Sequence, residues 1–390
     1  MDILDWIVAG SLAATFLIYI VYLLILRIFC SLSRRPPAPQ TSEKADSLPS
    51  LSVIVPTFNE VTVIRAKLEA LTATSYPKEK REIIVVDSGS TDGTQKIVEE
   101  YGERGVILRK QKERMGKANA INFALQKANG DIIVLTDANA EFSPEALSKL
   151  VQKFDKNTGA VLPRYVPDGK LSYWDKVFHE LHHVYKSLES EADSVFIVFG
   201  ELFAFRRELI EGIDEDAAAD DLEIALTIRK KGYKIRYSPE VEVKEKVPSG
   251  QKEVRIQKTR RIFGIVQAMM NNFSFFLNPK YGIYGLLIFP THFLQMTLGP
   301  FLVFASLVLL IGKLCILLAS SPVLGTVLLV SFFVFLILYF SLGFVKKAVS
   351  VGYNFLATEA FMIIALVNLV RGKKYGVWEK IASTRDGAEG

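Results

Sequence analysis

Charged and apolar residues are segregated along this chain into long, separate blocks. Residues 6–26 carry no charged side chain, and between residues 281 and 345 the only formal charge is Lys313. Half of the 390 residues are hydrophobic although 23% are charged, a combination that does not suit one uniformly mixed globular domain. About 20 consecutive apolar residues in a helix span the ~30 Å hydrocarbon core of a bilayer. The sequence therefore predicts membrane helices on both sides of a polar domain.

The N-terminal apolar block, residues 1–30, is predicted to be a retained transmembrane helix. A cleaved signal peptide would have basic residues before a shorter apolar core, whereas Asp2 and Asp5 precede this block and Arg27 follows its apolar part. Because basic flanks stay on the cytosolic side, we expect a multi-pass protein of the cell membrane with a cytosolic polar domain. Residues 31–50 are rich in proline, serine and charge, which indicates a linker.

The C-terminal apolar region, residues 281–372, leaves its number of spans open. At least two spans are expected, with a break near residues 320–322, and a further split at Gly299 is an alternative. Residues 348–370 have Glu359 in their middle, and as a third span they would put the basic residues that follow them outside, against the positive-inside bias. We therefore favour an interfacial helix with Glu359 in solvent over an intramembrane functional carboxylate.

Between the apolar blocks, residues 51–250 alternate short β-branched runs with helical patterns. Strands are expected at residues 52–55, 82–86, 106–109 and 131–136, each followed by a helix. Alternation of this kind, with continuously apolar strands, predicts an α/β domain whose mostly parallel sheet is covered on both faces. Such sheets bind ligands beyond the carboxyl ends of their strands. Residues 251–280 are predicted to form an amphipathic interfacial helix, and residues 373–390 a C-terminal tail.

The remaining composition limits the classes of site. Cys30 and Cys315 lie beside or within apolar blocks, so the polar domain has no disulfide framework and no thiolate metal site. The net charge of +5 is modest and its basic residues gather near the membrane edges, which favours anionic lipids over nucleic acid as partners. His179, His182 and His183 share one predicted helix, where a place under the membrane is favoured over a zinc site.

Polar motifs follow the first two predicted strands. The first strand leads into Pro56, Thr57, Phe58, Asn59 and Glu60. The second leads into Asp87, Ser88, Gly89, Ser90, Thr91, Asp92, Gly93 and Thr94. Carboxylates in this second loop suit a base edge or ribose hydroxyls, and glycine permits close backbone approach. A helix N-cap at Thr91 or Asp92 explains only one of these residues, so a ligand site is favoured.

Three further motifs stand at element ends. Lys117 begins a predicted helix, where a cation suits a diphosphate, although a surface lysine is the commoner explanation. Asp137 and Asn139 end an apolar strand and point the same way; two oxygen ligands so placed suit Mg²⁺ or Mn²⁺, and turn chemistry explains them equally well. Asp220 and Asp221 open a helix, either as partners of its dipole or with one of them as a general base.

A basic motif lies on the amphipathic helix predicted after the polar domain. It consists of Gln257, Lys258, Thr259, Arg260 and Arg261. Apolar residues are interspersed with these basic ones, so one helix face is expected on lipid and the start of the helix on phosphate.

In this order, the motifs resemble those of the family 2 glycosyltransferases, and most of all the membrane-integrated synthases of cellulose, hyaluronan, chitin and poly-N-acetylglucosamine. The resemblance covers about residues 51–267 by motif and the flanking segments by layout. It implies a GT-A fold and an inverting transfer from a nucleoside diphosphate sugar, in particular a UDP-sugar, to a growing polysaccharide, with Mg²⁺ or Mn²⁺. A single transfer to a lipid or polyprenyl phosphate carrier is the alternative. A non-catalytic transporter or receptor with a nucleotide-binding domain, and a nucleotidyltransferase, are the competing classes.

The resemblance also implies roles for single residues. Asp87 would contact the nucleotide base, and Asp137 with Asn139 would hold the metal on the diphosphate. Asp221, or less favourably Asp220, would deprotonate the acceptor hydroxyl. Fixed cations would offset charge on the leaving diphosphate without reorganisation, a role for Lys117 and Arg260. The expected donor site further includes Pro56, Thr57, Asn59, Glu60, Ser88, Gly89 and Asp92.

Two departures from the family pattern weaken the polysaccharide interpretation. The metal motif usually ends in aspartate, where this chain has Asn139, a neutral and weaker ligand. The motif that begins at Gln257 usually ends in a tryptophan that stacks on the acceptor sugar, and here it ends in Arg261. A guanidinium can stack, but it also suits a phosphate or lipid headgroup. Glu201, Gln257 and Arg261 are the predicted acceptor-binding residues.

Overall fold

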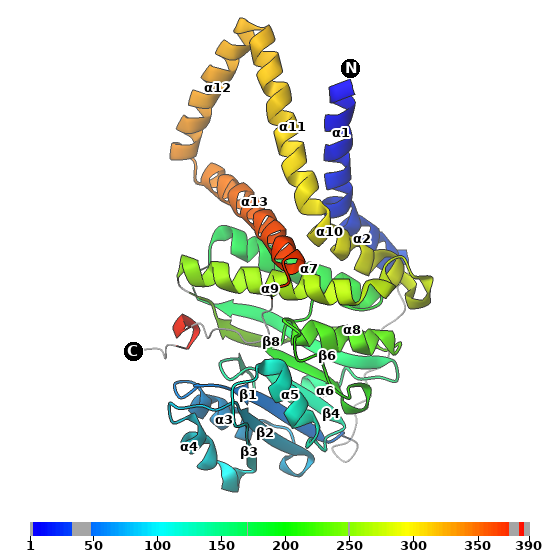
Figure 1. Cartoon of the computed structure of the whole chain (residues 1–390), viewed down its shortest axis with the longest axis vertical. Helices are drawn as coiled ribbons and strands as arrows, with labels where there is room; N and C mark the ends of the chain where they lie inside the picture. The colour runs from blue at the N-terminus through cyan, green and yellow to red at the C-terminus, as the bar shows by residue number, and fades with distance from the viewer. Residues whose placement is uncertain (1–2, 33–47, 170, 249, 374–381, 386–390) are drawn as a thin grey trace.

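The computed structural model describes residues 3–32, 48–169, 171–248, 250–373 and 382–385. Most of the predicted linker at 31–50 and of the predicted tail at 373–390 therefore lies outside the described residues. Figure 1 shows an α/β domain from which long apolar helices project at one end, with the chain's N-terminal helix among them.

An eight-stranded mixed sheet forms the centre of the α/β domain, in the order β3-β2-β1-β4-β7-β6-β8-β5. Its strands are β1 (Leu51–Thr57), β2 (Arg81–Asp87), β3 (Val106–Lys110), β4 (Ile132–Thr136), β5 (Glu141–Phe142), β6 (Thr158–Asp168), β7 (Leu202–Arg206) and β8 (Lys234–Lys246). The first four strands form a parallel half. β7 is antiparallel to β4 and β6, β5 is antiparallel to β8, and β6 and β8 run parallel. The predicted GT-A-like, mostly parallel α/β fold is confirmed, and its four predicted strands are β1 to β4.

Helices cover both faces of the sheet, as continuously apolar strands require. One face carries α3 (Ile64–Thr72), α4 (Thr94–Glu99) and α6 (Ala146–Val151), and the other carries α5 (Lys117–Leu125) and α8 (Asp220–Lys230). Along β1, Val53 and Val55 enter the first apolar cluster, whereas Ile54 enters the second. All three side chains are fully buried, so strand alternation distributes one apolar run between two cores.

A third apolar cluster joins the α/β domain to the membrane helices. It lies around α2 (Tyr22–Leu32), α7 (Tyr173–Ala192), α9 (Gln251–Asn271) and α10 (Phe289–Thr297). Tyr22 and Leu26 come from the membrane end, Phe263 and Val266 from α9, and Phe196 from the loop before β7. The predicted amphipathic helix therefore buries its apolar face on neighbouring elements of the protein as well.

Three helical stretches among the described residues are long and apolar enough to cross a membrane: Asp5–Leu32, Gly299–Ser320 and Gly343–Val370. The first comprises α1 (Ile3–Phe16), a π-helical turn η1 (Leu17–Val21) and α2. The second is α11 (Gly299–Ser320), from which α12 (Pro322–Ser341) turns back, so the predicted break near residues 320–322 is confirmed (Figure 1). The chain also breaks at Gly299, but α10, which precedes this break, packs on the α/β domain.

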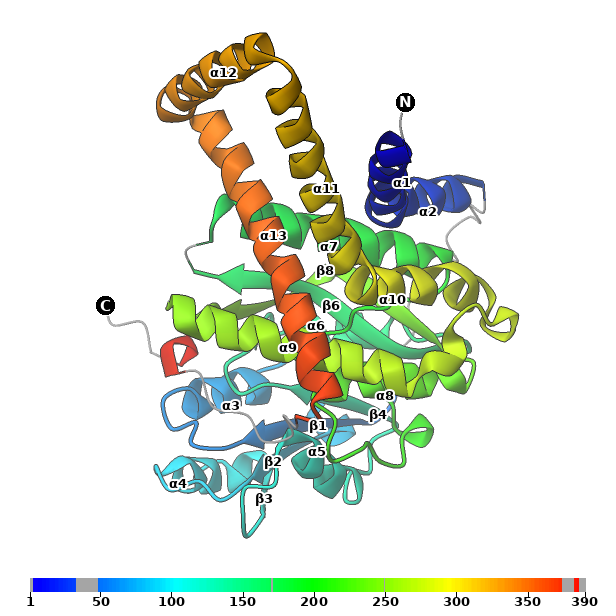
Figure 2. The same ribbon diagram turned by 45° about the horizontal axis from the view of Figure 1, so that its top comes forward.

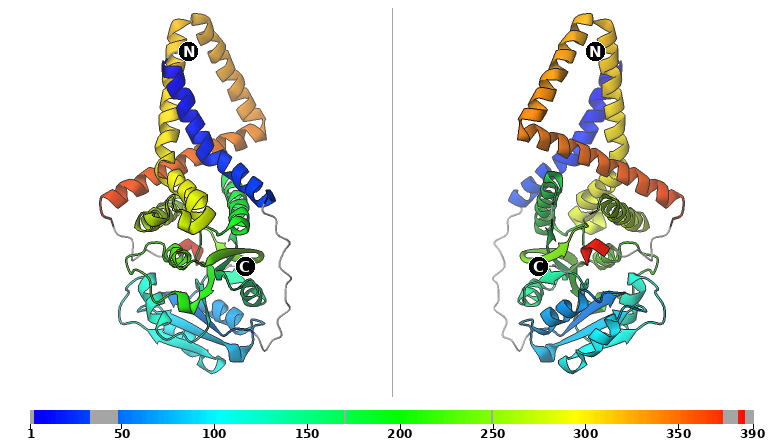
Figure 3. Two further views of the ribbon diagram at one scale, coloured as in Figure 1. Left: turned by 90° about the vertical axis from the view of Figure 1, so that its right-hand side faces the viewer. Right: turned by 90° about the vertical axis from the view of Figure 1, so that its left-hand side faces the viewer.

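Helix α13 (Gly343–Val370) leaves the α11–α12 hairpin at an angle and crosses over α9 (Figures 2 and 3). Glu359 in its middle is only 1% exposed. Its Oε2 accepts a hydrogen bond from Tyr19 Oη at 2.8 Å. The prediction of a solvated Glu359 is therefore wrong, because α13 turns this side chain inward against the bend in the first membrane helix.

Candidate functional site

A cleft opens at the carboxyl ends of β1, β2 and β4, which is where open parallel sheets bind ligands. Its open volume, including solvent at the mouth, is about 630 Å³. It is lined by Pro56, Thr57, Phe58, Glu60, Ser88, Arg114, Gly116, Lys117, Ala120, Asp137, Ala138 and Arg385. Many of the predicted donor-site residues thus meet in one cleft, although they come from loops far apart in sequence.

Hydrogen bonds join the loop after β1 to the loop after β2. Asn59 has a positive φ of 55°; its backbone N donates to Ser90 Oγ at 2.8 Å, and its Oδ1 accepts from Thr91 N at 2.9 Å. Asp92 accepts from Val61 N at 3.1 Å and from Thr94 N at 3.0 Å. The N-cap residue of α4 (Thr94–Glu99) is Gly93, without a side-chain cap bond, so the N-cap alternative for Thr91 or Asp92 is wrong. The Asp92 carboxylate instead joins the β1 loop to the first residue of the helix.

Asp87 is fully buried and is not among the residues that line the cleft. Its Oδ1 accepts from Gly89 N at 3.1 Å, Ser90 N at 2.9 Å and Gln95 Nε2 at 2.6 Å. Asp87 thus accepts two donors from its own loop and one from α4, which fixes the shape of the loop, and Gly89 supplies the positive φ of 81° that the turn needs. Direct contact between Asp87 and a nucleotide base stays a prediction.

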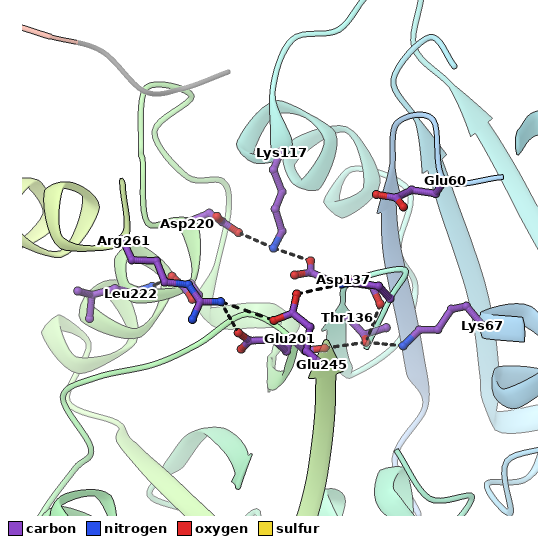
Figure 4. Close-up of polar contacts among 12 residues, drawn as sticks. Glu60, Lys67, Lys117, Thr136, Asp137, Glu201, Asp220, Leu222, Glu245 and Arg261 are labelled. Atoms are coloured by element: carbon purple, nitrogen blue, oxygen red, sulfur yellow. Dashed lines mark hydrogen bonds and ion pairs between the residues drawn. The ribbon is translucent and has the colours of Figure 1, made fainter. Parts of the chain in front are cut away.

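Lys117 is the centre of the charged part of the site. Its Nζ lies 2.7 Å from Asp137 Oδ1 and 3.7 Å from Asp220 Oδ2, so the ends of α5, β4 and α8 meet at one ammonium group (Figure 4). Burial opposes the charge on Lys117, but Asp137 and Asp220 together raise its pKa above the ordinary value. Burial likewise opposes ionisation of Asp137, and Lys117 nevertheless holds the pKa of that carboxyl below its usual range.

Asp221, beside Asp220 at the start of α8, has a different environment. Its Oδ1 accepts from Leu222 N at 2.8 Å. Burial first, and then the charge of Asp220, raise the pKa of Asp221 to about 7. A Cβ added to Gly200 would lie 3.2 Å from Lys117 Nζ and 3.4 Å from Asp221 Oδ2. Because glycine has no Cβ, the Lys117 ammonium and the Asp221 carboxylate can both lie close to the backbone at this position.

The predicted acceptor-side residues lie next to this centre. Arg261 Nη2 is 2.8 Å from Glu201 Oε1 and 3.6 Å from Glu245 Oε2 (Figure 4). The Arg261 guanidinium also lies 5.3 Å from the Phe199 ring centroid. The Glu201 carbonyl accepts from Thr136 Oγ1 at 2.8 Å, which ties the Arg261–Glu201 pair to the end of β4.

Arg260 belongs to the same charged cluster, and Gln257 lies one turn earlier on α9. Burial and the adjacent Arg261 lower the pKa of Arg260 to about 10, while Asp137 and Asp220 act in the opposite direction. Gln257 is half-buried. The arginine end of this motif therefore lies near the carboxylates of the site, whereas Gln257 lies one turn away from it.

Asn139, one of the two predicted metal ligands, is 8% exposed. Its Nδ2 donates to Glu245 Oε1 at 3.1 Å, and its Oδ1 is buried without a hydrogen-bond donor in the described part of the chain. A buried acceptor of this kind fits a cation or a ligand hydroxyl. Within the described ranges, no three His, Cys, Asp or Glu side chains form a metal-binding group. A divalent ion held by Asp137 and Asn139 would therefore need further oxygens, such as those of a diphosphate.

The three histidines of α7 face different neighbours. His183 Nδ1 lies 2.9 Å from Tyr237 Oη. The His182 ring packs on Phe178, with centroids 4.2 Å apart, and burial lowers the pKa of His182 to about 3. Burial also lowers the pKa of His179 to about 4. These rings therefore act as neutral packing groups on α7.

Arg385 is a cleft residue that sequence reasoning missed. It follows a short 3₁₀ turn, η9 (Ala382–Thr384), and its Nε and Nη2 each lie 3.2 Å from a carboxylate oxygen of Glu60. The arginine thus returns from the C-terminal segment to the first strand loop. No periodicity or motif marks it in a polar tail, so no sequence signal could have identified it.

Lys67 is a second missed residue. It is 4% exposed and donates to Thr136 Oγ1 and to the Ala140 carbonyl, both at 2.7 Å, on either side of Asp137. Burial lowers the pKa of Lys67 to about 7. A lysine on the apolar face of α3, beside Ile64 and Leu68, was the available signal, because lysine is almost never fully buried without a partner.

Comparisons with known proteins agree with the fold and with the family that the motifs resemble. Residues 52–214 match the family model described as Glycosyl transferase family 2. A probable glycosyltransferase of Bacillus subtilis (strain 168), YdaM, is 31% identical over 237 residues, which are 57% of this chain and 56% of that protein. The poly-β-1,6-N-acetyl-D-glucosamine synthase of Staphylococcus aureus (strain COL) is 26% identical over 219 residues, 54% of this chain and 52% of the synthase. The chain thus spans about half the length of these curated relatives.

One solved structure is similar along nearly the whole chain. It is the mannosyltransferase PcManGT from Pyrobaculum calidifontis in complex with GDP-Man and Mn²⁺, with 26% sequence identity and a TM-score of 0.73. The similarity covers 95% of this chain and 100% of that one. It therefore includes the apolar helices as well as the sheet domain.

Proposed function

This chain belongs to glycosyltransferase family 2, and from that premise we propose that it transfers one sugar at a time from a nucleoside diphosphate sugar to an acceptor held at the cytosolic face of the membrane. The acceptor oxygen attacks the anomeric carbon, and its proton passes to Asp221. The bond from that carbon to the diphosphate breaks, and the nucleoside diphosphate leaves. A single displacement of this kind inverts the anomeric configuration.

This proposal rests chiefly on one observation: Asp221 and Lys117 both lie beside Gly200. A general base works best when its pKa is near the operating pH, and burial beside Asp220 brings the pKa of Asp221 to about 7. Lys117 provides positive charge next to the cleft, where a leaving diphosphate gains negative charge. The proposed base and the cation therefore both lie beside Gly200, near the same point.

The cations around the cleft support a diphosphate. Arg385 and Arg114 line it together with Lys117. Arg260 is close enough to Asp137 and Asp220 for these carboxylates to raise its pKa, against the effect of burial. Asp137 and Asn139 would hold a divalent ion, which supplies Lewis-acid stabilisation of the leaving group when bound. The resemblance of the motifs implies a UDP-sugar, whereas the solved neighbour is a complex with GDP-Man and Mn²⁺, so both nucleotides are candidates.

For the acceptor, we favour a hydroxyl group on a phosphate-bearing lipid carrier over a growing polysaccharide. Arg261, paired with Glu201, occupies the position where a stacking tryptophan was expected, and a guanidinium suits a phosphate. The similarity over the whole chain is to a mannosyltransferase, while the similarity to a polysaccharide synthase covers about half of that protein. A polysaccharide remains the second candidate because of that synthase.

A donor panel tests the proposal. Full-length protein in detergent is incubated with Mn²⁺ and GDP-mannose, GDP-glucose, UDP-glucose or UDP-N-acetylglucosamine, and released nucleoside diphosphate is measured. Membranes with radiolabelled donor then separate an organic-extractable product, which we expect, from a large polymer that a glycosidase digests. Release of a nucleoside diphosphate from these donors would decide against a nucleotidyltransferase, whose leaving group is pyrophosphate from a nucleoside triphosphate.

Replacement of the base tests the mechanism. Asp221→Asn should lower kcat by about 10²- to 10⁴-fold, the usual contribution of a general base, with donor KM little changed. Glu208→Gln, at an exposed carboxylate after β7, is the matched control and should keep full activity. Undiminished transfer by Asp221→Asn would remove Asp221 from this role.

A further inference from the structure

Asn139 and Glu245 form a buried pair at the carboxyl end of β4. Asn139 is 8% and Glu245 6% exposed, and Asn139 Nδ2 donates to Glu245 Oε1 at 3.1 Å. The two residues are distant in sequence, yet β8 brings them together, since β5 pairs with β8 and Glu141 lies opposite Lys244. Glu245 therefore approaches Asn139 from a fixed strand position.

This hydrogen bond determines which atom of the Asn139 amide points toward Glu245 and which points away from it. An ionised carboxylate only accepts hydrogen bonds, so it can face the NH₂ group of an amide but not its oxygen. The bond to Glu245 therefore turns Asn139 Oδ1 away from Glu245. Asn139 Oδ1 is buried and has no hydrogen-bond donor among the residues that the structure describes. The pair thus presents one unsatisfied oxygen, fixed in direction, two residues after Asp137.

Glu245 itself is held by a second group. Its Oε2 lies 3.6 Å from Arg261 Nη2 and has no hydrogen-bond partner. The guanidinium is already paired with Glu201 at 2.8 Å. Arg261 therefore stabilises charge on both glutamates, and the stronger contact is with Glu201, which leaves Glu245 available to Asn139.

We propose that Glu245 is a positioning residue for the divalent cation of the donor site: it orients the Asn139 amide so that Oδ1 faces the ion, and lends its charge to that neutral ligand. This inference rests on the proposed function, in which Asp137 and Asn139 hold the ion. A neutral amide is a weaker ligand for Mg²⁺ or Mn²⁺ than a carboxylate. A carboxylate hydrogen-bonded to the far side of a ligand fixes its orientation and strengthens it, and removal of such partners typically costs about 10- to 100-fold in metal affinity.

The alternative is that the pair has a purely structural role and only joins β8 to the end of β4. A buried hydrogen bond of that kind would contribute to stability alone. An exchange of the two functional groups separates these interpretations. In Asn139→Asp/Glu245→Gln the carboxylate becomes the direct ligand and the amide becomes its orienting partner, so the pair keeps its hydrogen bond, its size and its single negative charge.

The test measures Mn²⁺ affinity of the full chain by electron paramagnetic resonance of free Mn²⁺, with GDP and with UDP, beside the thermal midpoint without metal. We expect Glu245→Gln to bind Mn²⁺ about 10- to 100-fold more weakly than the unaltered chain. The exchange variant should regain most of that affinity. Glu242→Gln, an exposed glutamate on the same strand, is the matched control and should bind as the unaltered chain does.

Two results would overturn the inference while leaving the proposed function intact. One is unchanged Mn²⁺ affinity in Glu245→Gln. The other is a loss in Glu245→Gln that the exchange variant does not restore although its thermal midpoint is normal. If the unaltered chain binds no Mn²⁺ with either nucleotide, the metal-dependent part of the proposed function fails, and the inference fails with it.

Discussion

At the scale of single residues, the site keeps neighbouring carboxylates in different states. Lys117 contacts Asp137 at 2.7 Å and holds its pKa low, whereas Asp221, buried beside Asp220, has a pKa raised to about 7. In active sites, two carboxyl groups can take different roles when their environments give them different pKa values. Asp137 is thereby suited to permanent charge beside a cation, and Asp221 to accepting a proton.

The pH dependence of the reaction follows from Asp221. Because its pKa is raised to about 7, its basic form is populated above that pH and is lost as the pH falls. The quantity kcat/KM, which reports the free enzyme, should therefore fall about tenfold per pH unit below 7. Burial and Glu201 also raise the pKa of Glu245 to about 7, so Glu245→Gln serves as a comparison that should keep this limb. If kcat/KM of Asp221→Asn still fell in the same way below pH 7, a group other than Asp221 would be responsible for the pH dependence.

Arg385 should contribute to donor binding. Its guanidinium lines the cleft and pairs with Glu60, close to where a diphosphate is proposed to lie. Hydrogen bonds to charged groups are worth about 1.5–3 kcal/mol, so Arg385→Ala should raise donor KM by about 10- to 100-fold, while Arg385→Lys keeps part of the effect. Steady-state kinetics with varied donor measure this. A donor KM that stays constant or falls would mean that the arginine only covers the cleft.

At the scale of elements, a buried glutamate links membrane helices to the loop that carries Glu201. Glu189 on α7 accepts from Tyr22 Oη at 2.8 Å and from His292 Nε2 at 2.5 Å, and its second oxygen accepts from Phe196 N at 2.9 Å. Phe196 stands shortly before Glu201 in the loop that enters the site. Three elements, α2, α7 and α10, therefore converge on the segment that carries the acceptor-side residues.

Loss of one of these bonds should weaken the whole assembly. Tyr22→Phe removes a donor to a buried carboxylate, which costs about 1–3 kcal/mol, or very roughly 2–4 °C in Tm per kcal/mol. Thermal unfolding of the purified chain in detergent measures this. Tyr353→Phe, at a tyrosine that is 72% exposed on α13, should leave Tm unchanged. Equal Tm values for the two variants would show that the Glu189 cluster does not stabilise the fold.

At the scale of the whole molecule, the Arg385–Glu60 contact constrains membrane topology. Both ends of this contact must lie on the catalytic side, so the chain crosses the membrane an even number of times between the α/β domain and Arg385. If α11 and α12 both cross, α13 has to remain at the surface, as its path across α9 suggests (Figure 3). Arg371 and Lys373, which follow α13, then lie on the same side of the membrane as the α/β domain.

Cysteine labelling tests this topology. In a chain with Cys30→Ser and Cys315→Ser, a cysteine placed at Lys373 should react with a membrane-impermeant maleimide only from the side on which Lys156→Cys reacts, because Lys156 lies in the α/β domain. Both positions are exposed. Labelling of the two cysteines from opposite sides would make α13 a third crossing.

The sequence predicted those parts of the fold and site whose signals are local. Continuous apolar strands and polar strand ends led to the parallel half of the sheet and to the meeting of Lys117, Asp137 and Asp220. Glu245, Lys67 and Arg385 were missed because their contacts join segments far apart, and a charged residue in a strand, helix or tail does not reveal its partner. Glu359 was misjudged for the same reason, since only the position of Tyr19 shows that α13 turns it inward.

The apolar cluster around Tyr22, Phe196 and Phe263 has a practical consequence for anyone who wishes to work with this enzyme. The sheet domain cannot simply be cut free and produced as a water-soluble reagent, because Phe196 and Phe263 would lose the surface on which they rest. The loop that carries Glu201 would lose its support together with them. Attachment to the membrane helices and support of the loop that carries Glu201 thus depend on the same apolar cluster, so removal of the membrane helices should also disturb the site.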